Sequence, residues 1–305
     1  MVAVTPRVVV VVGPTATGKT ALGVALARAI GGEVVNADSM QLYRGMDIGT
    51  AKATPAERGG VAHHLLDIWD VVETASVADY QARARACVDE LLARGRTPVV
   101  VGGSGLYVRA LIDRIEFPGT DPALRARLEA ELAAGGPQPL HERLASVDPA
   151  AAAAILPTNG RRIVRALEVV ELTGRPFTAT LPAYEPVYDA VQIGLDLPAP
   201  ALDARIATRV DRMFATGLVE EVRRLERAGL RQGRTAGRAL GYQQVLAHLD
   251  GRLTEAQARE ETVRATRRFV RRQRSWFRRD PRVAWLDADE PNVSDAALRR
   301  ITSGA

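Results

Sequence analysis

Cysteine and lysine are nearly missing from this 305-residue chain, and long apolar runs are missing altogether. The single cysteine, Cys87, cannot form an internal disulfide, which excludes a small disulfide-stapled secreted fold. No apolar run approaches the roughly 20 residues that span a bilayer, and no basic segment with a long apolar core suggests a secretory signal. The chain also lacks heptads and internal repeats. We therefore expect a cytoplasmic protein, without membrane contact and monomeric.

Positive charge is plentiful but consists almost wholly of arginine. The chain has 41 basic and 36 acidic side chains, and only Lys19 and Lys52 are lysines. A lysine kept against this bias suggests a task that needs a compact ammonium rather than a planar guanidinium. Nine arginines and one acid, Asp280, fall within residues 264–282. This concentration favours binding to a polyanion, with a merely solvated helix face as the alternative.

Lys19 belongs to a phosphate-binding pattern. Five valines at residues 8–12 predict a strand buried on both faces, and residues 21–27 predict the start of a helix. Between them lies the spacing Gly-x-x-x-x-Gly-Lys-Thr, made up of Gly13, Pro14, Thr15, Ala16, Thr17, Gly18, Lys19 and Thr20. Backbone N–H groups and Lys19 would bind phosphate or pyrophosphate, and the Thr20 hydroxyl would hold Mg²⁺.

The remaining chain continues this α/β pattern with one interruption. Further strands are predicted at residues 33–37, 97–103, 191–197 and 283–286. Between residues 116 and 184 only helical segments follow one another. We predict an α/β fold with a P-loop NTPase-like parallel sheet flanked by helices. Residues 1–115 and 187–305 would form this core, and residues 116–186 an all-helical insertion domain.

Two more segments should lie beside the phosphate loop. Asp38 follows the second strand and a Gly-Gly-Ser-Gly loop begins at Gly102, and the carboxyl ends of parallel strands face the ligand crevice. P-loop kinases and NTPases usually complete their Mg²⁺ site with an aspartate at a strand end, but the strand at 97–103 has no such carboxylate. The only strand predicted to end in an aspartate is the one that leads to Asp38, so Asp38 is either a metal-site residue or a base. His63 and His64 lack a third ligand at useful spacing, which favours a structural role.

Several motifs, taken in order, resemble the bacterial tRNA dimethylallyltransferase (tRNA isopentenyltransferase) family. They are the phosphate loop, residues 38–52 (Asp-Ser-Met-Gln-Leu-Tyr-Arg-Gly-Met-Asp-Ile-Gly-Thr-Ala-Lys), 102–107 (Gly-Gly-Ser-Gly-Leu-Tyr), 161–168 (Arg-Arg-Ile-Val-Arg-Ala-Leu-Glu), 241–244 (Gly-Tyr-Gln-Gln) and 271–277 (Arg-Arg-Gln-Arg-Ser-Trp-Phe). The stretch 38–52 is the most specific, because ordinary P-loop kinases lack it.

The resemblance implies transfer of a dimethylallyl group from its diphosphate to N6 of the adenosine 3′-adjacent to the anticodon, position 37, with release of diphosphate. The phosphate loop would then hold the leaving diphosphate. An adenine amine is a poor nucleophile, so Asp38 is the candidate base. Arg209 matches the family position for a leaving-group arginine, and Ser104 stands where the family often has threonine. The implied catalytic residues are Lys19, Thr20, Asp38, Ser104 and Arg209, with Mg²⁺ on Thr20.

The implied partner is the anticodon stem-loop of tRNA, whose target base must leave its stack to be modified. By resemblance, the residues that would contact the tRNA are Asp38, Ser39, Met40, Gln41, Ser104, Arg127, Arg161, Arg162, Ile163, Val164, Arg165, Arg238, Gly241, Tyr242, Gln243, Arg271 and Arg274.

Two other functions stay open. One is a small-molecule enzyme, either a P-loop kinase or a prenyltransferase acting on a free adenine nucleotide. The helical insertion and the basic C-terminal segment disfavour it, because a free nucleotide needs neither. The other is a nucleic-acid-binding NTPase without transfer activity, which the stretch 38–52 disfavours.

Overall fold

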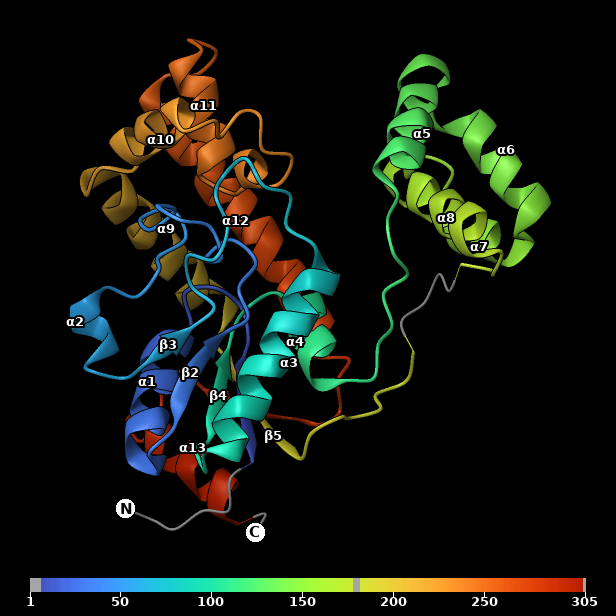
Figure 1. Cartoon of the computed structure of the whole chain (residues 1–305). Coiled ribbons are helices and arrows are strands. Elements are labelled where there is room, and N and C mark those ends of the chain that lie inside the picture. Colours follow the sequence, from blue (N-terminus) through green and yellow to red (C-terminus); the bar gives the residue numbers. More distant parts are fainter. Residues whose placement is uncertain (1–6, 178–181, 304–305) are drawn as a thin grey trace. The chain divides into compact units, whose positions relative to one another are not determined.

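The computed structural model describes residues 7–177 and 182–303, and its core is one parallel β-sheet (Figure 1). Six strands lie in the order β3-β2-β4-β1-β5-β6, and every pairing is parallel. Their bounds are β1 Val8–Val12, β2 Glu33–Asn36, β3 His63–His64, β4 Pro98–Val101, β5 Ala190–Asp196 and β6 Val283–Asp287. The predicted α/β class is confirmed.

The valines of β1 place it at the centre of the sheet. All five are at most 1% exposed, because β1 pairs with β4 on one side and β5 on the other. Side chains alternate along a strand, so Val8, Val10 and Val12 enter one apolar core while Val9 and Val11 enter a second. A run of consecutive β-branched residues is what a strand buried on both faces requires.

Helices cover both faces of the sheet (Figure 1). The core around Val9 and Val11 is completed by apolar side chains of α1 (Lys19–Ile30) and α13 (Val293–Thr302). On the other face lie α3 (Val77–Ala93) and α4 (Gly105–Ile112), which share the larger core. The helix α13 is a feature that the sequence analysis missed.

A cluster of helices follows β5 and packs on the larger core. It consists of α9 (Ala199–Ala215), α10 (Leu218–Arg227), the short 3₁₀ helix η1 (Ala236–Arg238), α11 (Tyr242–Leu249) and α12 (Glu255–Phe277). A reciprocal capping box between Thr254 and Gln257 begins α12, the predicted arginine helix. A one-turn helix, α2 (Pro55–Arg58), lies earlier in the chain. Within residues 7–177 and 182–303, no helix has both the length and the apolarity to cross a membrane.

The chain divides into two compact units, residues 1–113 with 186–305, and residues 114–185. The second unit contains α5 (Pro122–Gly135), α6 (Pro137–Val147), α7 (Pro149–Ala154) and α8 (Gly160–Thr173). Asp121, Asp148 and Asn159 each cap a helix N-terminus with a side-chain oxygen, and Leu128, Leu144 and other apolar side chains form a separate core. The sequence pattern predicts this unit at residues 116–186, within two residues of these bounds.

In the first unit, the chain leaves and re-enters at neighbouring points. Asp113 forms an isolated antiparallel bridge with Pro186, and the N–H of Val187 donates to the carbonyl of Ile112 at 2.8 Å. The buried carboxylate of Asp113 binds Arg109 and Arg282 at 2.7 and 2.6 Å. The ion pairs fix the departing end at Asp113 to the sheet unit, and the hydrogen bond from Val187 to Ile112 joins the returning end to it.

Candidate active site at the carboxyl edge of the sheet

The phosphate loop connects β1 to α1 and takes its shape from glycine. Gly13 has φ +133°, and a Cβ there would come within 2.2 Å of the carbonyl oxygen of Leu195. Gly18 occupies the N-cap of α1 in the left-handed region and, as a glycine, has no side chain to cap that helix start. The Thr17 hydroxyl closes the loop by donating to the carbonyl of Pro14 at 2.9 Å. The uncapped N–H groups at the start of α1 remain available for an anion.

Lys19 lies inside this loop, near a second cation. Its Nζ donates to the carbonyl of Pro14 at 2.7 Å. Burial, together with the charge of Arg209, lowers the pKa of Lys19 to about 7, and the charge of Asp38 opposes the shift. Burial also lowers the pKa of Arg209, again opposed by Asp38. Two desolvated cations close to one carboxylate are typical of a site built for an anionic ligand.

Asp38 is held by the last residue of β2. The Asp38 N–H donates to Oδ1 of Asn36 at 3.0 Å, and Nδ2 of Asn36 donates to the Asp38 carbonyl at 3.1 Å. One carboxylate oxygen, Oδ1, accepts the N–H of Met40 at 3.0 Å. The other oxygen, Oδ2, has no hydrogen-bond donor among the residues that the structure describes. Asp38 can therefore accept a proton through that oxygen without losing its anchoring.

Ser104 joins the Gly-Gly-Ser-Gly loop after β4 to the segment after β2. Its Oγ accepts the N–H of Ser39 at 3.1 Å and lies 3.1 Å from the Ser39 hydroxyl. The two loops touch closely, because a Cβ on Gly102 would come within 2.3 Å of the carbonyl oxygen of Ala37. Asp38 and Ser104 thus lie at the same edge of the sheet, as the sequence predicted from the strand ends.

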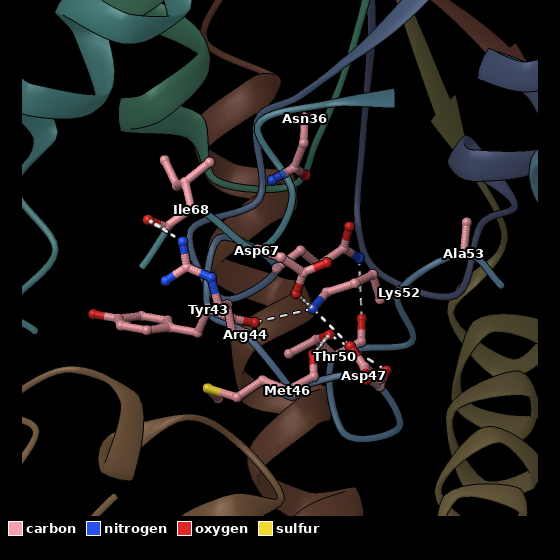
Figure 2. Close-up of polar contacts among 12 residues, drawn as sticks. Asn36, Tyr43, Arg44, Met46, Asp47, Thr50, Lys52, Ala53, Asp67 and Ile68 are labelled. Atoms are coloured by element: carbon pink, nitrogen blue, oxygen red, sulfur yellow. Dashed lines mark hydrogen bonds and ion pairs between the residues drawn. The ribbon is translucent and has the colours of Figure 1, made fainter. Parts of the chain in front are cut away.

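The stretch after Asp38 is organised around the second lysine, Lys52 (Figure 2). Its Nζ donates to the carbonyl of Tyr43 at 3.0 Å, to Asp47 at 2.7 Å and to Asp67 at 2.6 Å. The ammonium is buried, and these three oxygens use all of its donors. Lys52 therefore stabilises the loop and has no donor left for a substrate.

Glu221 of α10 fixes the outer part of the same loop. Its buried carboxylate accepts three backbone N–H groups, from Asp47, Ile48 and Gly49, at 3.1, 2.8 and 3.2 Å. It also accepts the hydroxyl of Tyr242 at 2.6 Å. The Tyr242 side chain is completely buried, so it supports the loop from behind and forms no part of a tRNA-binding surface.

A cavity of about 370 Å³ opens between these loops and the helix cluster. The predicted site residues that line it are Thr15, Asp38, Ser39, Met40, Ser104, Arg209, Arg238 and Gln243. Ala239 and Leu240, which lie between the predicted contacts Arg238 and Gly241, also line it. The lining residues that the sequence did not single out are Gly49, Thr50, Ile206, Val210, Met213, Thr262, Thr266, Phe269 and Arg272. The loops contribute mainly polar side chains to the lining. The helices α9 and α12 contribute the apolar Ile206, Val210, Met213 and Phe269 together with Arg209, Thr262, Thr266 and Arg272.

The missed residues follow a simple helical pattern. Ile206, Val210 and Met213 recur at i, i+4 and i+7 along α9, and Thr262, Thr266 and Phe269 do the same along α12. This spacing marks one face of each helix and was visible in the sequence. The same spacing occurs in a helix face that lines a cavity and in one that fills a core. The spacing alone therefore does not identify cavity-lining residues.

The arginine run divides into arginines that pair with acids and arginines that do not. Arg264, Arg267, Arg274, Arg278 and Arg282 each pair with an aspartate or glutamate. Among the described residues, no acidic partner occurs for Arg268, Arg271, Arg272 and Arg279. Arg274, one of the predicted tRNA contacts, binds Asp196 at 2.9 Å and the carbonyl of Leu197 at 2.7 Å, whereas Arg271 is exposed.

Asp196 corrects one step of the sequence interpretation. It is the last residue of β5, next to β1, so Asp38 does not follow the only strand that ends near a carboxylate. Arg274 and Arg278 both bind the Asp196 carboxylate, at 2.9 and 2.8 Å. This carboxylate is already neutralised by two guanidinium groups, which makes it a poor candidate for a metal ligand or base.

The remaining predicted contacts in the first unit are distributed around the cavity. Gln41 donates from Nε2 to the carbonyl of Thr50 at 3.1 Å and so stabilises the loop after Asp38. Gly241 is buried and its N–H donates to Oε1 of Gln244 at 2.9 Å. Arg238 and Gln243 are exposed and line the cavity.

The helical unit contains the other predicted tRNA contacts. Ile163 and Val164 are buried in its core, which corrects their interpretation as surface contacts. Arg165 is engaged internally, with Glu168 at 2.6 Å and the carbonyl of Pro118 at 2.6 Å. The exposed members of the set are Arg127, Arg161 and Arg162, and Arg127 forms ion pairs with Glu131 and Glu171.

A metal ion would find few protein ligands at this edge. Within the described residues, no group of three or more histidine, cysteine, aspartate or glutamate side chains could hold one. His64 binds Glu33 at 2.7 Å and His63 the carbonyl of Val61 at 2.9 Å, in keeping with a structural role. The Thr20 hydroxyl makes no hydrogen bond to described residues. This arrangement fits Mg²⁺, which commonly binds one or two protein oxygens and takes its other ligands from phosphate and water.

Comparisons with known proteins agree with one another. A family model described as IPP transferase matches residues 41–280. The chain is 71% identical over 299 residues to the tRNA dimethylallyltransferase of Streptomyces coelicolor, covering 97% of this chain and 96% of that protein. It is 69% identical over 298 residues to the tRNA dimethylallyltransferase of Salinispora arenicola, covering 98% and 87%.

Solved structures give the same result. The crystal structure of the full-length tRNA isopentenylpyrophosphate transferase from Bacillus halodurans matches with a TM-score of 0.72 and 41% identity, covering 97% of both chains. A eukaryotic dimethylallyltransferase, captured in crystallographic snapshots of its action on tRNA, matches with a TM-score of 0.83 and 26% identity, covering 96% of this chain and 78% of that one. The chain therefore belongs to the IPP transferase family of prenyltransferases that modify tRNA.

Proposed function

We propose that this enzyme transfers a dimethylallyl group from dimethylallyl diphosphate to N6 of adenosine 37, the nucleotide 3′-adjacent to the anticodon of a tRNA, and releases diphosphate. The observation that carries the proposal is the cavity of about 370 Å³, whose lining combines polar and apolar side chains. Thr15 of the phosphate loop and Asp38 are among its polar lining residues, and Val210 and Phe269 are among its apolar ones. Dimethylallyl diphosphate likewise combines an apolar five-carbon group with a charged diphosphate.

The chemical step needs one proton acceptor and one stabilised leaving group. The N6 lone pair attacks C1 of the dimethylallyl group while the bond from C1 to the diphosphate oxygen breaks and its electrons go to that oxygen. N6 then loses one proton, and Asp38 is the proposed acceptor. Support comes from the position of Asp38 in the cavity lining and from the absence of a donor to its Oδ2 among the described residues.

Lys19 and Arg209 are proposed to stabilise the charge that develops on the diphosphate. An anion brought beside Lys19 favours the charged ammonium, so binding of the diphosphate returns the pKa of Lys19 toward its usual range. The N–H groups at the start of α1 add fixed dipoles. Mg²⁺ bound by Thr20 and the diphosphate would neutralise further charge on the leaving group. Ser104 is proposed to hold Ser39 and with it the position of Asp38.

The anticodon stem-loop is the proposed part of the tRNA that binds. The unpaired arginines of α12, including Arg271 and Arg272, and the exposed Arg161 and Arg238 would contact the phosphate backbone. The adenine would enter the cavity after leaving its stack, and this unstacking costs a few kcal/mol. A free adenine nucleotide is the alternative acceptor, and the basic face of α12 disfavours it.

We also propose that the enzyme works as a monomer in the cytoplasm. The large apolar side chains that are exposed among the described residues are Val72, Val147, Leu156 and Leu172, and Val72 alone belongs to the sheet unit. Scattered residues of this kind are ordinary on a monomer surface. Sedimentation velocity at micromolar concentration tests this point, and a concentration-dependent dimer would contradict it.

The main experiment incubates the protein with Mg²⁺, radiolabelled dimethylallyl diphosphate and either tRNA, AMP or ATP. Label on adenosine 37 of tRNA supports the proposal, whereas label on the free nucleotide supports the alternative. If no label is transferred and ATP is hydrolysed, the proposal fails and the protein is an NTPase. Asp38→Asn is the matched variant, because it keeps the side-chain shape and removes the acceptor. It should lower transfer by about 10²–10⁴-fold while pyrophosphate binding stays near wild type.

A further inference from the structure

The side chain of Gln273, on α12, contacts both loops that carry the proposed chemistry. Its Oε1 accepts the N–H of Thr15 in the phosphate loop at 2.9 Å, and its Nε2 donates to the carbonyl of Gly103 after β4 at 2.8 Å. The residue is only 5% exposed. Segments 258 and 170 positions away in the sequence are thus joined by one planar amide.

The bridge continues to the proposed proton acceptor. Gly103 precedes Ser104, whose Oγ accepts the N–H of Ser39 at 3.1 Å, and Ser39 follows Asp38 in the chain. A connected path of hydrogen bonds and single peptide units therefore runs from Thr15 to Asp38. One end of this path holds the leaving group in the proposed reaction, and the other end accepts the proton.

The packing around this bridge leaves little freedom. A Cβ on Gly103 would come within 2.4 Å of Nε2 of Gln273, and a Cβ on Gly105 would come within 2.1 Å of Nε1 of Trp276. The loop after β4 is therefore pressed against α12 at two neighbouring turns. At neutral pH the amide supplies one acceptor and one donor in a single plane, whereas an ionised carboxylate has no donor and a thioether has only a weak acceptor.

We propose that Gln273 is a positioning residue for prenyl transfer: its amide keeps the phosphate loop and the loop after β4 in register, so that the diphosphate and Asp38 face the same carbon atom correctly. The inference rests on the proposed function. It also gives α12 a second task beside its basic face. A displacement of about 1 Å between reacting groups can lower a rate about 100-fold.

Gln273→Met tests the bridge, because it keeps the length of the side chain and removes both hydrogen bonds. We expect the KM for dimethylallyl diphosphate and the Kd for Mg²⁺-pyrophosphate to rise about tenfold, the effect of one lost hydrogen bond. We expect kcat to fall about 10–100-fold, and the Kd for tRNA to stay within about twofold. A residue that only stabilises the fold would lower the active fraction and leave KM and Kd unchanged. Ser275→Met, at an exposed position of the same helix, is the control and should behave as wild type.

Gln273→Glu gives a second and independent readout. When its carboxyl group is protonated, it can again donate to the Gly103 carbonyl and accept from Thr15; when ionised, it cannot donate. The activity of this variant relative to wild type should therefore rise as the pH falls, while the relative activity of Gln273→Met stays level across the same range. Equal pH profiles for the two variants would overturn the bridge.

Failure of this inference is distinguishable from failure of the proposed function. The pyrophosphate titration needs no transfer and measures the phosphate loop directly. If wild type transfers the prenyl group and Gln273→Met keeps the wild-type KM and pyrophosphate Kd, Gln273 is not a positioning residue. If wild type does not prenylate tRNA at all, the proposed function fails.

Discussion

The two lysines of the chain lie in two loops at the same edge of the sheet, and their surroundings differ in one decisive respect. Lys52 donates all three of its hydrogen bonds to protein oxygens, two of them carboxylates. Lys19 donates to a single carbonyl, and burial beside Arg209 lowers its pKa to about 7. The ammonium group of Lys52 thus has acceptors for all of its hydrogen bonds, whereas that of Lys19 has no carboxylate hydrogen-bonded to it among the described residues.

This difference separates a cation that stabilises the fold from one that awaits a ligand. A buried charge without a counter-ion opposes folding, so such a group is kept where a ligand supplies the missing charge. The same rule divides the arginines of α12 and of its C-cap, Arg278. Arg274 and Arg278 share the carboxylate of Asp196, whereas Arg271 has no acidic partner among the described residues. Whether a cation already has an acidic partner in the protein therefore indicates its role better than its residue type does.

Lys19→Met should give the largest effect on function. Loss of one charge stabiliser at the leaving group is expected to lower kcat about 10²–10³-fold, measured by prenyl transfer to tRNA at saturating substrate. The free energy of unfolding should not fall. Because the pKa of Lys19 is lowered on folding, its charge opposes the folded state below its unfolded pKa, and removing it relieves that opposition.

Lys19→Arg is the matched control for charge. A planar guanidinium does not fit a loop closed around a compact ammonium, so this variant should recover little of the lost rate. Recovery to near the wild-type kcat would show that any cation suffices in the loop. The loop would then not require the compact ammonium group of a lysine.

Lys52→Met should give the opposite result. It leaves the Tyr43 carbonyl and two carboxylates without their shared donor, and Asp47 and Asp67 are 53% and 41% exposed, which lets water take over in part. We expect a loss of about 2–3 kcal/mol in the free energy of unfolding, measured by urea denaturation. The folded fraction should bind pyrophosphate with wild-type affinity. A Lys52→Met protein with wild-type stability would contradict the comparison.

Much of this site was predictable from the sequence, for reasons that particular residues make clear. Five consecutive β-branched valines strongly favour a strand buried on both faces, and the loop after them has a fixed spacing. In a parallel sheet, strand ends meet at one edge, which brought Asp38 and Ser104 together with that loop. Such predictions succeed because backbone geometry dictates them.

The rest depended on partners that lie far away in the sequence. Nothing near Lys52 announces that Asp67 will meet it, and nothing near Gln273 indicates Thr15 or Gly103. The helix faces of α9 and α12 that line the cavity have the same residue period as faces that fill a core. Tyr242 belongs to a family motif and yet is buried against Glu221. Tertiary contacts decide these cases.

Chemical modification should distinguish the two lysines within one sample. Reductive methylation of a lysine requires the neutral amine, so the rate at Lys19 should rise with pH to a midpoint at about 7 and then level off. Between pH 6 and pH 8 the neutral fraction grows about tenfold. Lys52 should stay unmodified until the protein unfolds, and peptide mass spectrometry resolves the two sites. Pyrophosphate should protect Lys19, and equal labelling of both lysines would contradict the prediction.

Arg271→Ala should give the smallest effect, and it extends the comparison to α12. Removal of one phosphate contact should change the slope of log K against log salt for anticodon stem-loop binding by about 0.9 or less, with a few-fold loss of affinity near physiological salt. Arg278→Ala is the matched control, because its guanidinium binds Asp196 and covers the ring of Trp285 at 4.5 Å. That variant should keep the wild-type slope. If the two variants change the slope equally, Arg278 contacts RNA despite its ion pair with Asp196. The presence of an acidic partner would then not decide which arginines bind RNA.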